Sequence, residues 1–300
     1  MYSEHFLNPH ILANVSASLL EDMRVLSRRR HGEKPAEYQA LDYTAQLIPR
    51  DKTGKASVIT RQDAVLCGLP WFDACFTMLD PDCKLTWHAK EGDHIKAGQL
   101  LCEIQGKARA MLSAERSALN FLQTLSATAT VTRKYVELIA GTHAKIFDTR
   151  KTLPGLRVAQ KYAVKIGGGE NQRMALFDGI LIKENHIMAA GGIRQALAEA
   201  QRIAPPGMSI QIEVETLAQL TEALEAGAIL VLLDNFDLDA MGAAVKLNAG
   251  RAELEASGGI NFDTVRAIAE TGVDRISIGA LTKDIQAIDL SMRFQISPAI

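Results

Sequence analysis

Between residues 145 and 278 the chain alternates short apolar runs with longer segments whose apolar residues recur at helical spacing. The short runs are typical of buried strands, and the longer segments are typical of helices with one buried face. This pattern predicts strands at residues 145–147, 179–182, 209–214, 229–233, 252–256 and 275–278. It predicts helices between them at residues 157–166, 193–203, 216–226, 238–247 and 262–271.

The regular alternation of strand and helix indicates right-handed βαβ units and a parallel sheet, and therefore an α/β fold. With at least six such units, closure into a TIM-like βα barrel is favoured over an open sheet. A seventh strand near residues 163–169 is an alternative that leaves the barrel seven-stranded and incomplete. We expect the barrel domain to cover residues 116–286.

The first part of the chain has a different pattern. A helix is predicted at residues 9–23, and strands with turns follow at residues 57–66 and 84–104. These elements predict an N-terminal α+β sandwich lobe at residues 1–115, with the C-terminal tail at residues 287–300 as a candidate to return to it.

A long helix is predicted at residues 115–139, where Leu119 and Leu122 lie on one face. Ser113 is the expected N-cap of this helix. Arg116 would then lie near the helix start, where a cation opposes the helix dipole unless it has an anionic partner. An ordinary surface arginine is the alternative interpretation.

Charge and cysteine usage narrow the possible classes of partner. The formal net charge of −2 creates no global field that would favour nucleic acid or an anionic membrane, so a basic site must be local. The chain shows neither a signal peptide nor an apolar stretch that could span a bilayer. The four cysteines lack C-x-x-C spacing, which argues against zinc and for thiols in a reducing cytosol. We expect a cytoplasmic protein without a nucleic-acid or membrane partner.

Charged residues follow several of the predicted strands, and in a parallel βα barrel the active site forms at the carboxyl ends of the strands. The residues at these ends, with one from the loop before the second strand, are Arg150, Lys151, Arg173, Lys183, Glu213 and Asp234. Four of them are cations and two are acids. This balance fits a substrate with several negative charges and a divalent metal between the acids and a phosphate.

Glycine-rich segments follow the last two predicted strands, as Ser257-Gly258-Gly259 and Gly279-Ala280. Phosphate sites in barrels often lie in these loops, because glycine lets backbone N–H groups approach phosphate oxygens. Taken one at a time, some of these residues have a simpler, structural interpretation: Asp234 could cap the following helix, and Lys183 could pair with Glu184 in solvent.

Several of these residues lie in longer motifs distributed along the chain. The motifs are Glu115-Arg116, Asp148-Thr149-Arg150-Lys151, Lys161-Tyr162-Ala163-Val164, Gly167-Gly168-Gly169, Lys183-Glu184-Asn185-His186, Leu233-Asp234-Asn235 and Gly279-Ala280-Leu281-Thr282. Their combination resembles the quinolinate phosphoribosyltransferases, also called nicotinate-nucleotide pyrophosphorylases (carboxylating), over roughly residues 40–295.

This resemblance implies a pentosyltransferase that requires Mg²⁺. Its substrates would be quinolinate and phosphoribosyl pyrophosphate. Its products would be nicotinate mononucleotide, pyrophosphate and carbon dioxide, on the de novo route to NAD. The residues it places around the quinolinate carboxylates are Arg116, Arg150, Lys151, Gln172, Arg173 and Lys183, with Arg116 contributed by the neighbouring subunit of a homodimer or higher homo-oligomer.

The resemblance also implies catalytic roles for Lys151, Lys183, Glu213 and Asp234. Glu213 and Asp234 would serve the metal and the ribose hydroxyls. The phosphoribosyl pyrophosphate site would be completed by Ser257, Gly258 and Gly279.

Two segments depart from the pattern of this family. The family usually reads Asn-His-Arg after the triple glycine, whereas this chain has Asn171-Gln172-Arg173. Because glutamine can donate a hydrogen bond but carries no charge, a changed substrate affinity or pH dependence is expected. The basic run Arg28-Arg29-Arg30 replaces an acidic, glycine-rich stretch near the N-terminus, in a segment that we interpret as an exposed loop. Two rival functions stay open: a relative that acts on another anionic acceptor, and a barrel retained as a binding or scaffold protein.

Overall fold

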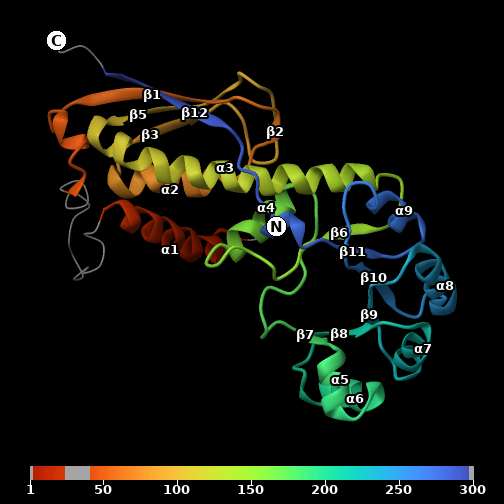
Figure 1. Cartoon of the computed structure of the whole chain (residues 1–300). Helices are drawn as coiled ribbons and strands as arrows, with labels where there is room; N and C mark the ends of the chain where they lie inside the picture. Colours follow the sequence, from red (N-terminus) through yellow and green to blue (C-terminus); the bar gives the residue numbers. More distant parts are fainter. Residues whose placement is uncertain (1–2, 24–40, 297–300) are drawn as a thin grey trace. The chain divides into compact units, whose positions relative to one another are not determined.

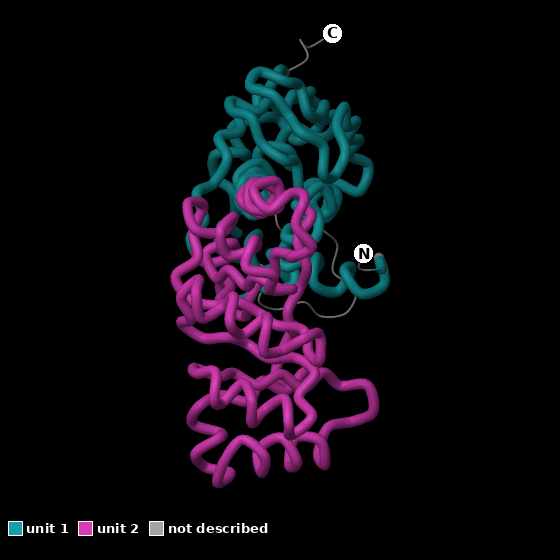
Figure 2. Tube along the Cα trace, turned by 90° about the vertical axis from the view of Figure 1, so that its right-hand side faces the viewer, with its two compact units in different colours: residues 1–130, 154–167, 284–300 teal, residues 131–153, 168–283 magenta. Residues whose placement is uncertain are grey.

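The computed structural model describes residues 3–23 and 41–296, which divide between two compact units (Figure 2). Unit 1 comprises Met1–Thr130, Pro154–Gly167 and Asp284–Ile300, and unit 2 comprises Val131–Leu153 and Gly168–Lys283. The unit boundary at Thr130 falls inside α3 (Ala108–Leu138), further along the chain than the expected boundary at residue 115. The predicted loop with Arg28, Arg29 and Arg30 lies outside the described residues.

Unit 2 contains a six-stranded, all-parallel sheet, which confirms the prediction of an α/β fold with parallel strands. The strands, in sheet order, are β6 (Lys145–Phe147), β11 (Arg275–Ser277), β10 (Glu253–Ser257), β9 (Leu230–Asp234), β8 (Ser209–Val214) and β7 (Gly179–Ile182). β6 and β7 therefore stand at the two ends of the order. Where a seventh strand was considered, the structure has the end of α4 (Arg157–Ile166), followed by a single parallel bridge between Phe147 and Glu170.

Helices follow the strands of unit 2 along the chain. They are α5 (Glu184–Ala190), α6 (Ile193–Ile203), α7 (Leu217–Glu225), α8 (Leu238–Asn248), α9 (Val265–Glu270) and α10 (Ala280–Lys283). Figure 1 shows α6 to α9 on the outer side of the sheet, and α6, α7 and α9 contact neighbouring strands. The pattern of apolar spacing predicted α6 to α9, but it did not predict α5, none of whose residues is buried.

Alternation along the strands gives the two faces of this sheet different chemistry, because successive side chains point to opposite faces. One set of alternate positions is apolar and buried: Ile212, Val214, Val231, Leu233, Leu254, Ala256 and Ile276. The other set is largely polar: Gln211, Glu213, Leu232, Asp234, Glu255, Ser257 and Ser277. Burial of each large apolar side chain contributes about 1.5–3 kcal/mol, so the apolar set fixes which face the polar set occupies.

Unit 1 contains a four-stranded antiparallel sheet in the order β12 (Leu290–Ile296), β1 (Thr53–Thr60), β5 (Leu100–Lys107) and β3 (Lys84–Trp87). Its other elements are α1 (Glu4–Asp22), a 3₁₀ turn (Ala45–Leu47), α2 (Leu69–Leu79), α4, and the short pair β2 (Ala64–Val65) and β4 (His94–Ile95). The core of this unit includes Trp71, Phe72 and Phe76 of α2, and Leu122 of α3. The C-terminal segment thus returns to the N-terminal sheet, where Leu290 pairs with Thr60.

The predicted start of the long helix was wrong. β5 ends at Lys107 and α3 begins at the next residue, so Ser113 lies inside the helix and donates its hydroxyl to Asp42 Oδ2 at 2.7 Å. The residues before Ser113 favour helix strongly enough to extend it to Ala108. Arg116 consequently lies more than two turns from the helix start, and the expected conflict with the helix dipole disappears.

Two further observations bear on the class of protein. Within residues 3–23 and 41–296, no helix is long and apolar enough to cross a membrane. All four cysteines are buried free thiols in unit 1.

Candidate active site

A cavity of about 520 Å³ opens at the carboxyl ends of the parallel strands of unit 2. Each of the six strands, or the loop that follows it, contributes side chains to the wall. The lining residues are Thr149, Arg150, Lys151, Gln172, Arg173, Leu181, Lys183, Gln211, Glu213, Leu232, Asp234, Glu255, Ser257 and Ser277. Polar ends of separate strands therefore meet at one site, as the parallel arrangement predicted.

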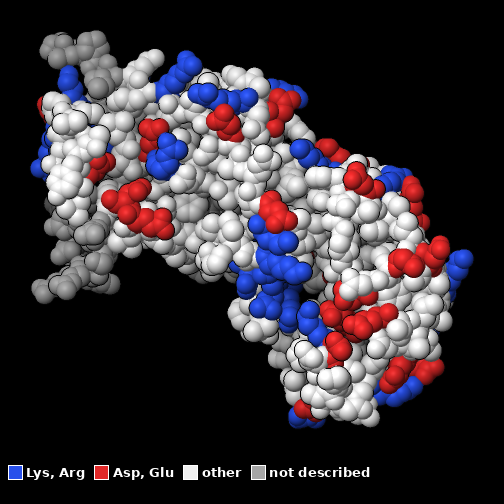
Figure 3. Space-filling model, viewed as in Figure 1, with Lys and Arg blue, Asp and Glu red and all other residues white. Residues whose placement is uncertain are grey.

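Four cations, Arg150, Lys151, Arg173 and Lys183, line this cavity. Burial lowers the pKa of Arg173, and the charge of Arg150 lowers it further. Figure 3 shows how Lys and Arg gather into one patch on the face drawn, next to a smaller group of Asp and Glu. Two guanidinium groups close enough to repel one another are unfavourable in an empty cavity, so the wall is suited to an anionic ligand.

The loop that carries Gln172 and Arg173 is held by two acids. Asp148, fully buried at the end of β6, accepts hydrogen bonds from Asn171 Nδ2 at 2.6 Å and from the Gln172 backbone N–H at 2.9 Å. Asp178 accepts from two backbone N–H groups further along the same loop, those of Met174 and Ala175. These contacts fix a loop that has no strand or helix of its own.

Arg173 is also fixed by the strand it precedes. Its Nη1 donates to the carbonyl oxygen of Gly179, the first residue of β7, at 2.8 Å. One edge of the guanidinium is therefore tied to the sheet, and its other N–H groups remain available to the cavity.

Lys183 lies at the junction of β7 and α5, where it is the N-cap residue. Its backbone N–H donates to His186 Nδ1 at 3.0 Å, which sets the backbone direction at this position. Its Nζ lies 3.3 Å from Glu213 Oε2 across the cavity mouth. The alternative of a surface pair with Glu184 therefore does not describe the structure.

Asp234 ends β9 and lines the cavity near Ser257, its register partner on β10. Its Oδ2 accepts from the side-chain amide of Asn235 at 2.9 Å. The helix that follows is capped by Asp237, which accepts from the Ala240 N–H at 2.8 Å. The alternative of Asp234 as the cap is therefore wrong.

Gly258 and Gly279 follow the strands β10 and β11, although neither lines the cavity. Gly258 has φ 102°, and a Cβ built there would lie 2.7 Å from Asn235 Oδ1. A Cβ at Gly279 would lie 3.0 Å from Lys151 Cδ. Both positions thus require close approach of backbone to neighbouring residues, which only glycine permits without displacement.

Glu213 and Asp234 are the carboxylates at the cavity mouth that could hold a divalent metal. Mg²⁺ in phosphate-transfer sites is bound through one or two carboxylates plus substrate phosphates, and this pair fits that requirement. A preformed protein cage is not what the structure offers: the described part of the chain contains no group of three or more His, Cys, Asp or Glu suited to a metal.

Six of the fourteen lining residues were not predicted, and the buried polar ones among them, Gln211, Glu255 and Ser277, form the cavity floor. Gln211 and Glu255 lie in the middle of strands and are almost fully buried, so a search of strand ends could not identify them. Their signal is the recurrence of polar residues at alternate positions of an apolar strand, as in Gln211 and Glu213 of β8.

Arg116 is exposed on the part of α3 that belongs to unit 1, and it is absent from the cavity lining. The remaining predicted residues lie either in the wall (Arg150, Lys151, Gln172, Arg173, Lys183, Glu213, Asp234 and Ser257) or directly after the strand ends (Gly258 and Gly279).

Two protein-family models match the chain. The model described as the N-terminal domain of quinolinate phosphoribosyl transferase matches residues 42–126, and the model of the C-terminal domain matches residues 128–293. A probable nicotinate-nucleotide pyrophosphorylase [carboxylating] of Bacillus subtilis is 40% identical over 256 residues, which cover 85% of this chain and 89% of that protein. A chloroplastic protein of the same name from Oryza sativa is 39% identical, over 84% of this chain and 72% of that protein. The solved nicotinate-nucleotide pyrophosphorylase of Francisella tularensis is 42% identical with a TM-score of 0.88, over 96% of this chain and 97% of that one.

Proposed function

This chain belongs to the quinolinate phosphoribosyltransferase family, and on that premise we propose that it transfers a phosphoribosyl group to quinolinate. The substrates are quinolinate and phosphoribosyl pyrophosphate, and the products are nicotinate mononucleotide, pyrophosphate and carbon dioxide. The reaction supplies the de novo route to NAD. The observation that carries this proposal is the cavity at the carboxyl ends of the strands, which four cations line together with Glu213 and Asp234 at its mouth and Glu255 at its floor.

Recognition of quinolinate rests on the cation wall. Arg150, Lys151 and Arg173 hold the two carboxylates of the pyridine ring, with Gln172 beside them. A planar guanidinium matches a carboxylate through two parallel N–H···O bonds, which suits the arginines to this end of the substrate. A monocarboxylate would leave part of the wall without a counter-charge, so the dicarboxylate is the better ligand.

The phosphoribosyl end is assigned to the acids and the glycine-rich loops. Lys183 lies between the two substrates, and Ser257, Gly258 and Gly279 contact phosphate oxygens. Mg²⁺ would be held by Glu213 and Asp234, where it would neutralise charge on the pyrophosphate leaving group. Asp234 also offers its carboxylate to the ribose hydroxyls.

The chemistry needs orientation and charge matching more than a covalent nucleophile. Departure of pyrophosphate leaves a ribose with oxocarbenium character, which the carboxylates of Glu213 and Asp234 stabilise. The pyridine nitrogen attacks this carbon and becomes cationic. The cationic ring then accepts the electron pair left by the departing carboxylate, and a proton replaces carbon dioxide on the ring.

Three finer features belong to the same proposal. The enzyme is a homodimer or higher homo-oligomer in which Arg116 of one subunit reaches the quinolinate of its neighbour, consistent with the exposure of that side chain. The six-stranded sheet is an incomplete barrel, supported by its helix-covered face and its polar inner face. The enzyme works in the cytoplasm, supported by its four free thiols.

A substrate comparison tests the proposal directly. Purified protein is incubated with phosphoribosyl pyrophosphate, Mg²⁺ and either quinolinate or nicotinate, and nucleotide formation and carbon dioxide release are followed. We expect turnover with quinolinate, equal amounts of nucleotide and carbon dioxide, and loss of turnover on chelation of the metal. Turnover with nicotinate alone would reject the assignment in favour of a relative with another acceptor.

A binding measurement separates the metal assignment from activity. Titration of phosphoribosyl pyrophosphate into Asp234→Asn should show that most of the Mg²⁺ dependence of binding is lost. Asp239→Asn, a carboxylate in the first turn of α8, serves as the matched control. Equal Mg²⁺ dependence in the Asp234 variant and the control would remove Asp234 from the metal site.

A further inference from the structure

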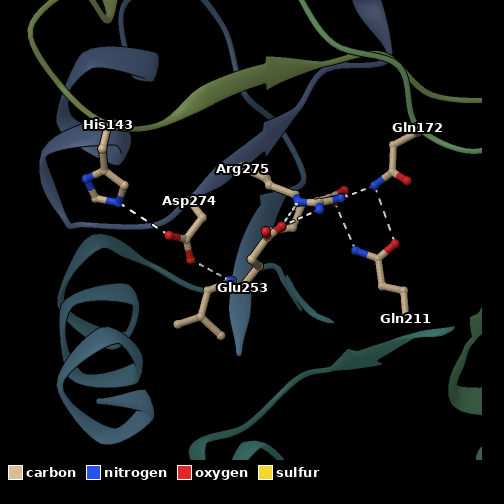
Figure 4. Close-up of polar contacts among 8 residues, drawn as sticks. His143, Gln172, Gln211, Glu253, Asp274 and Arg275 are labelled. Carbon is tan, nitrogen blue, oxygen red and sulfur yellow. Dashed lines mark hydrogen bonds and ion pairs between the residues drawn. The ribbon is translucent and has the colours of Figure 1, made fainter. Parts of the chain in front are cut away.

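Glu255, Gln211 and Gln172 form a hydrogen-bonded cluster on the floor of the cavity. The Nε2 of Gln211 donates to Glu255 Oε2 at 2.9 Å, and the Nε2 of Gln172 donates to the same oxygen. The Nε2 of Gln172 also lies 3.4 Å from Gln211 Oε1. Figure 4 shows the side-chain amides of Gln172 and Gln211 facing each other.

The cluster joins three separate parts of unit 2. Glu255 lies on β10, Gln211 lies on β8, and Gln172 lies in the loop before β7. Glu255 is only 1% exposed and Gln211 only 4% exposed, so water does not compete for their hydrogen bonds. A buried carboxylate that accepts from two amides is a strong orienting group, because leaving those donors unmatched would be costly.

Hydrogen-bond donors around Glu255 oppose the effect of its burial. Burial raises the pKa of Glu255, while hydrogen bonds from Gln211, Ser277 and Gln172 and the charge of Arg275 lower it. The surrounding donors thus offset part of the cost of keeping a carboxylate at the cavity floor.

The direction of the Gln172 amide follows from the same contacts. A carboxamide nitrogen has two hydrogens, and Glu255 and Gln211 provide an acceptor for each. Both N–H groups of the Gln172 amide are therefore used within the cluster. Gln172 lines the same cavity as Arg150 and Arg173, so the orientation of its amide is part of the wall that the acceptor acid meets.

We propose that Glu255 is a positioning residue, which holds the side-chain amide of Gln172 in the orientation that the acceptor acid meets in the cavity wall. This inference rests on the proposed function, because the acceptor is taken to be quinolinate. Without the carboxylate the Gln172 amide loses one of its two acceptors and can take other orientations. The acceptor acid must then order this amide when it binds, and it binds less tightly.

The test is a double-mutant cycle on the full-length enzyme with quinolinate, phosphoribosyl pyrophosphate and Mg²⁺. The variants are Glu255→Leu, Glu255→Gln, Gln172→Ala and the double variant of Glu255→Leu with Gln172→Ala. We expect Glu255→Leu to raise the KM for quinolinate by about 10-fold to 100-fold, the range of one charge-assisted hydrogen bond. The KM for phosphoribosyl pyrophosphate should stay within about twofold of wild type, because its site does not include Gln172.

Two comparisons distinguish positioning from mere support of the fold. Glu255→Gln keeps an oxygen acceptor of the same size, so it should restore most of the affinity. In the Gln172→Ala background, Glu255→Leu should have no further effect on the KM for quinolinate, because the side chain it acts through is gone. Additive effects in the cycle, or a Glu255→Gln variant as impaired as Glu255→Leu, would overturn the proposal.

A second variant protects the test against a folding defect. If Glu255→Leu does not fold, Glu255→Asp replaces it in the cycle, since the shorter side chain withdraws the carboxylate from Gln172 but keeps the charge. The same dependence on Gln172 is then expected, and independence overturns the proposal. If wild-type enzyme turns over quinolinate and the effects in the cycle are additive, only the role of Glu255 is rejected. Wild-type enzyme that does not turn over quinolinate rejects the proposed function, and this inference with it.

Discussion

Replacing Arg150 by alanine should weaken binding of quinolinate without weakening the fold. Arg150 lies in the loop after β6 and lines the cavity together with Arg173. The charge of Arg150 contributes to the lowered pKa of Arg173, so the two guanidinium groups repel each other when no anion lies between them. Arg150→Ala should therefore lower the affinity for quinolinate without lowering the stability of the fold.

The magnitude follows from the bonds that are lost. Removal of a charge-assisted hydrogen bond costs about 1.5–3 kcal/mol, which corresponds to an increase of about 10-fold to 100-fold in the Kd for quinolinate. Loss of a repelling charge offsets the loss of packing, so the melting temperature should be unchanged or higher. Arg150→Lys should lie between wild type and Arg150→Ala in affinity, because it keeps the charge and loses the planar fork.

Calorimetric titration of quinolinate and a thermal scan on the same samples measure both quantities. Arg202→Ala is the matched control, since Arg202 forms an exposed pair with Glu199 on α6 and should affect neither property. If Arg150→Ala binds quinolinate within about twofold of wild type, Arg150 does not contact the acceptor. A lower melting temperature with normal affinity would mean that Arg150 supports the fold instead.

Three further predictions concern other parts of the molecule. Burial raises the pKa of every cysteine thiol, to about 12 for Cys83 and Cys102. A thiol reagent at about pH 8 should therefore label none of them in the native protein and all four in denaturant. Labelling of the native protein would contradict their burial. Gly258→Ala should destabilise the fold by about 1 kcal/mol or more and weaken phosphoribosyl pyrophosphate binding in a titration, because Gly258 has φ 102° and its Cβ would lie 2.7 Å from Asn235 Oδ1. Gly242→Ala in α8, where φ is not positive and no neighbour lies within 4 Å of the Cβ, is the control. Burial raises the pKa of Glu91 above its ordinary value, so the folded state holds this proton more tightly than the unfolded state. The stabilising effect of this bound proton is present at acid pH and is lost as the pH rises through the folded-state pKa of Glu91. Urea melts should show Glu91→Gln gaining stability relative to wild type over that rise in pH, and a difference that stays constant with pH would refute this.

The strands and helices of unit 2 could be predicted from sequence because each has one continuous or periodic apolar signal. β6, β7 and β8 and the helix α6 have the predicted bounds, and so does α4 in unit 1. These elements bury a recognisable set of side chains, and burial is what the pattern reports. The ends of β9 and β10 shifted by one residue toward their polar termini, which is within the usual uncertainty of element ends.

Elements without such a signal were missed or misplaced. α5 has no buried residue, so no apolar spacing could reveal it. α2 is apolar on several faces, since Trp71, Phe72, Cys75 and Phe76 are all buried, and a run of this kind carries no clear period. α3 began five residues before its predicted cap because β5 continues into it without a loop.

Some residues of the candidate site could likewise be predicted from the sequence, and others could not. Residues at strand ends could be predicted because the parallel topology brings those ends together. Gln211 and Glu255 depend on a contact between β8, β10 and the loop before β7, and only the folded chain shows that contact.

The pairing of β12 with β1 has a consequence for synthesis on the ribosome. β1 is translated before any part of unit 2, whereas its partner strand β12, with Leu290 opposite Thr60, is translated only after unit 2. Until then β1 has β5 on one side and an open edge on the other, and an open edge readily captures a strand from another chain. Nascent chains of this protein are therefore most prone to misassembly while unit 2 is being translated, and a stop codon ahead of Leu290 leaves that edge exposed for the lifetime of the molecule.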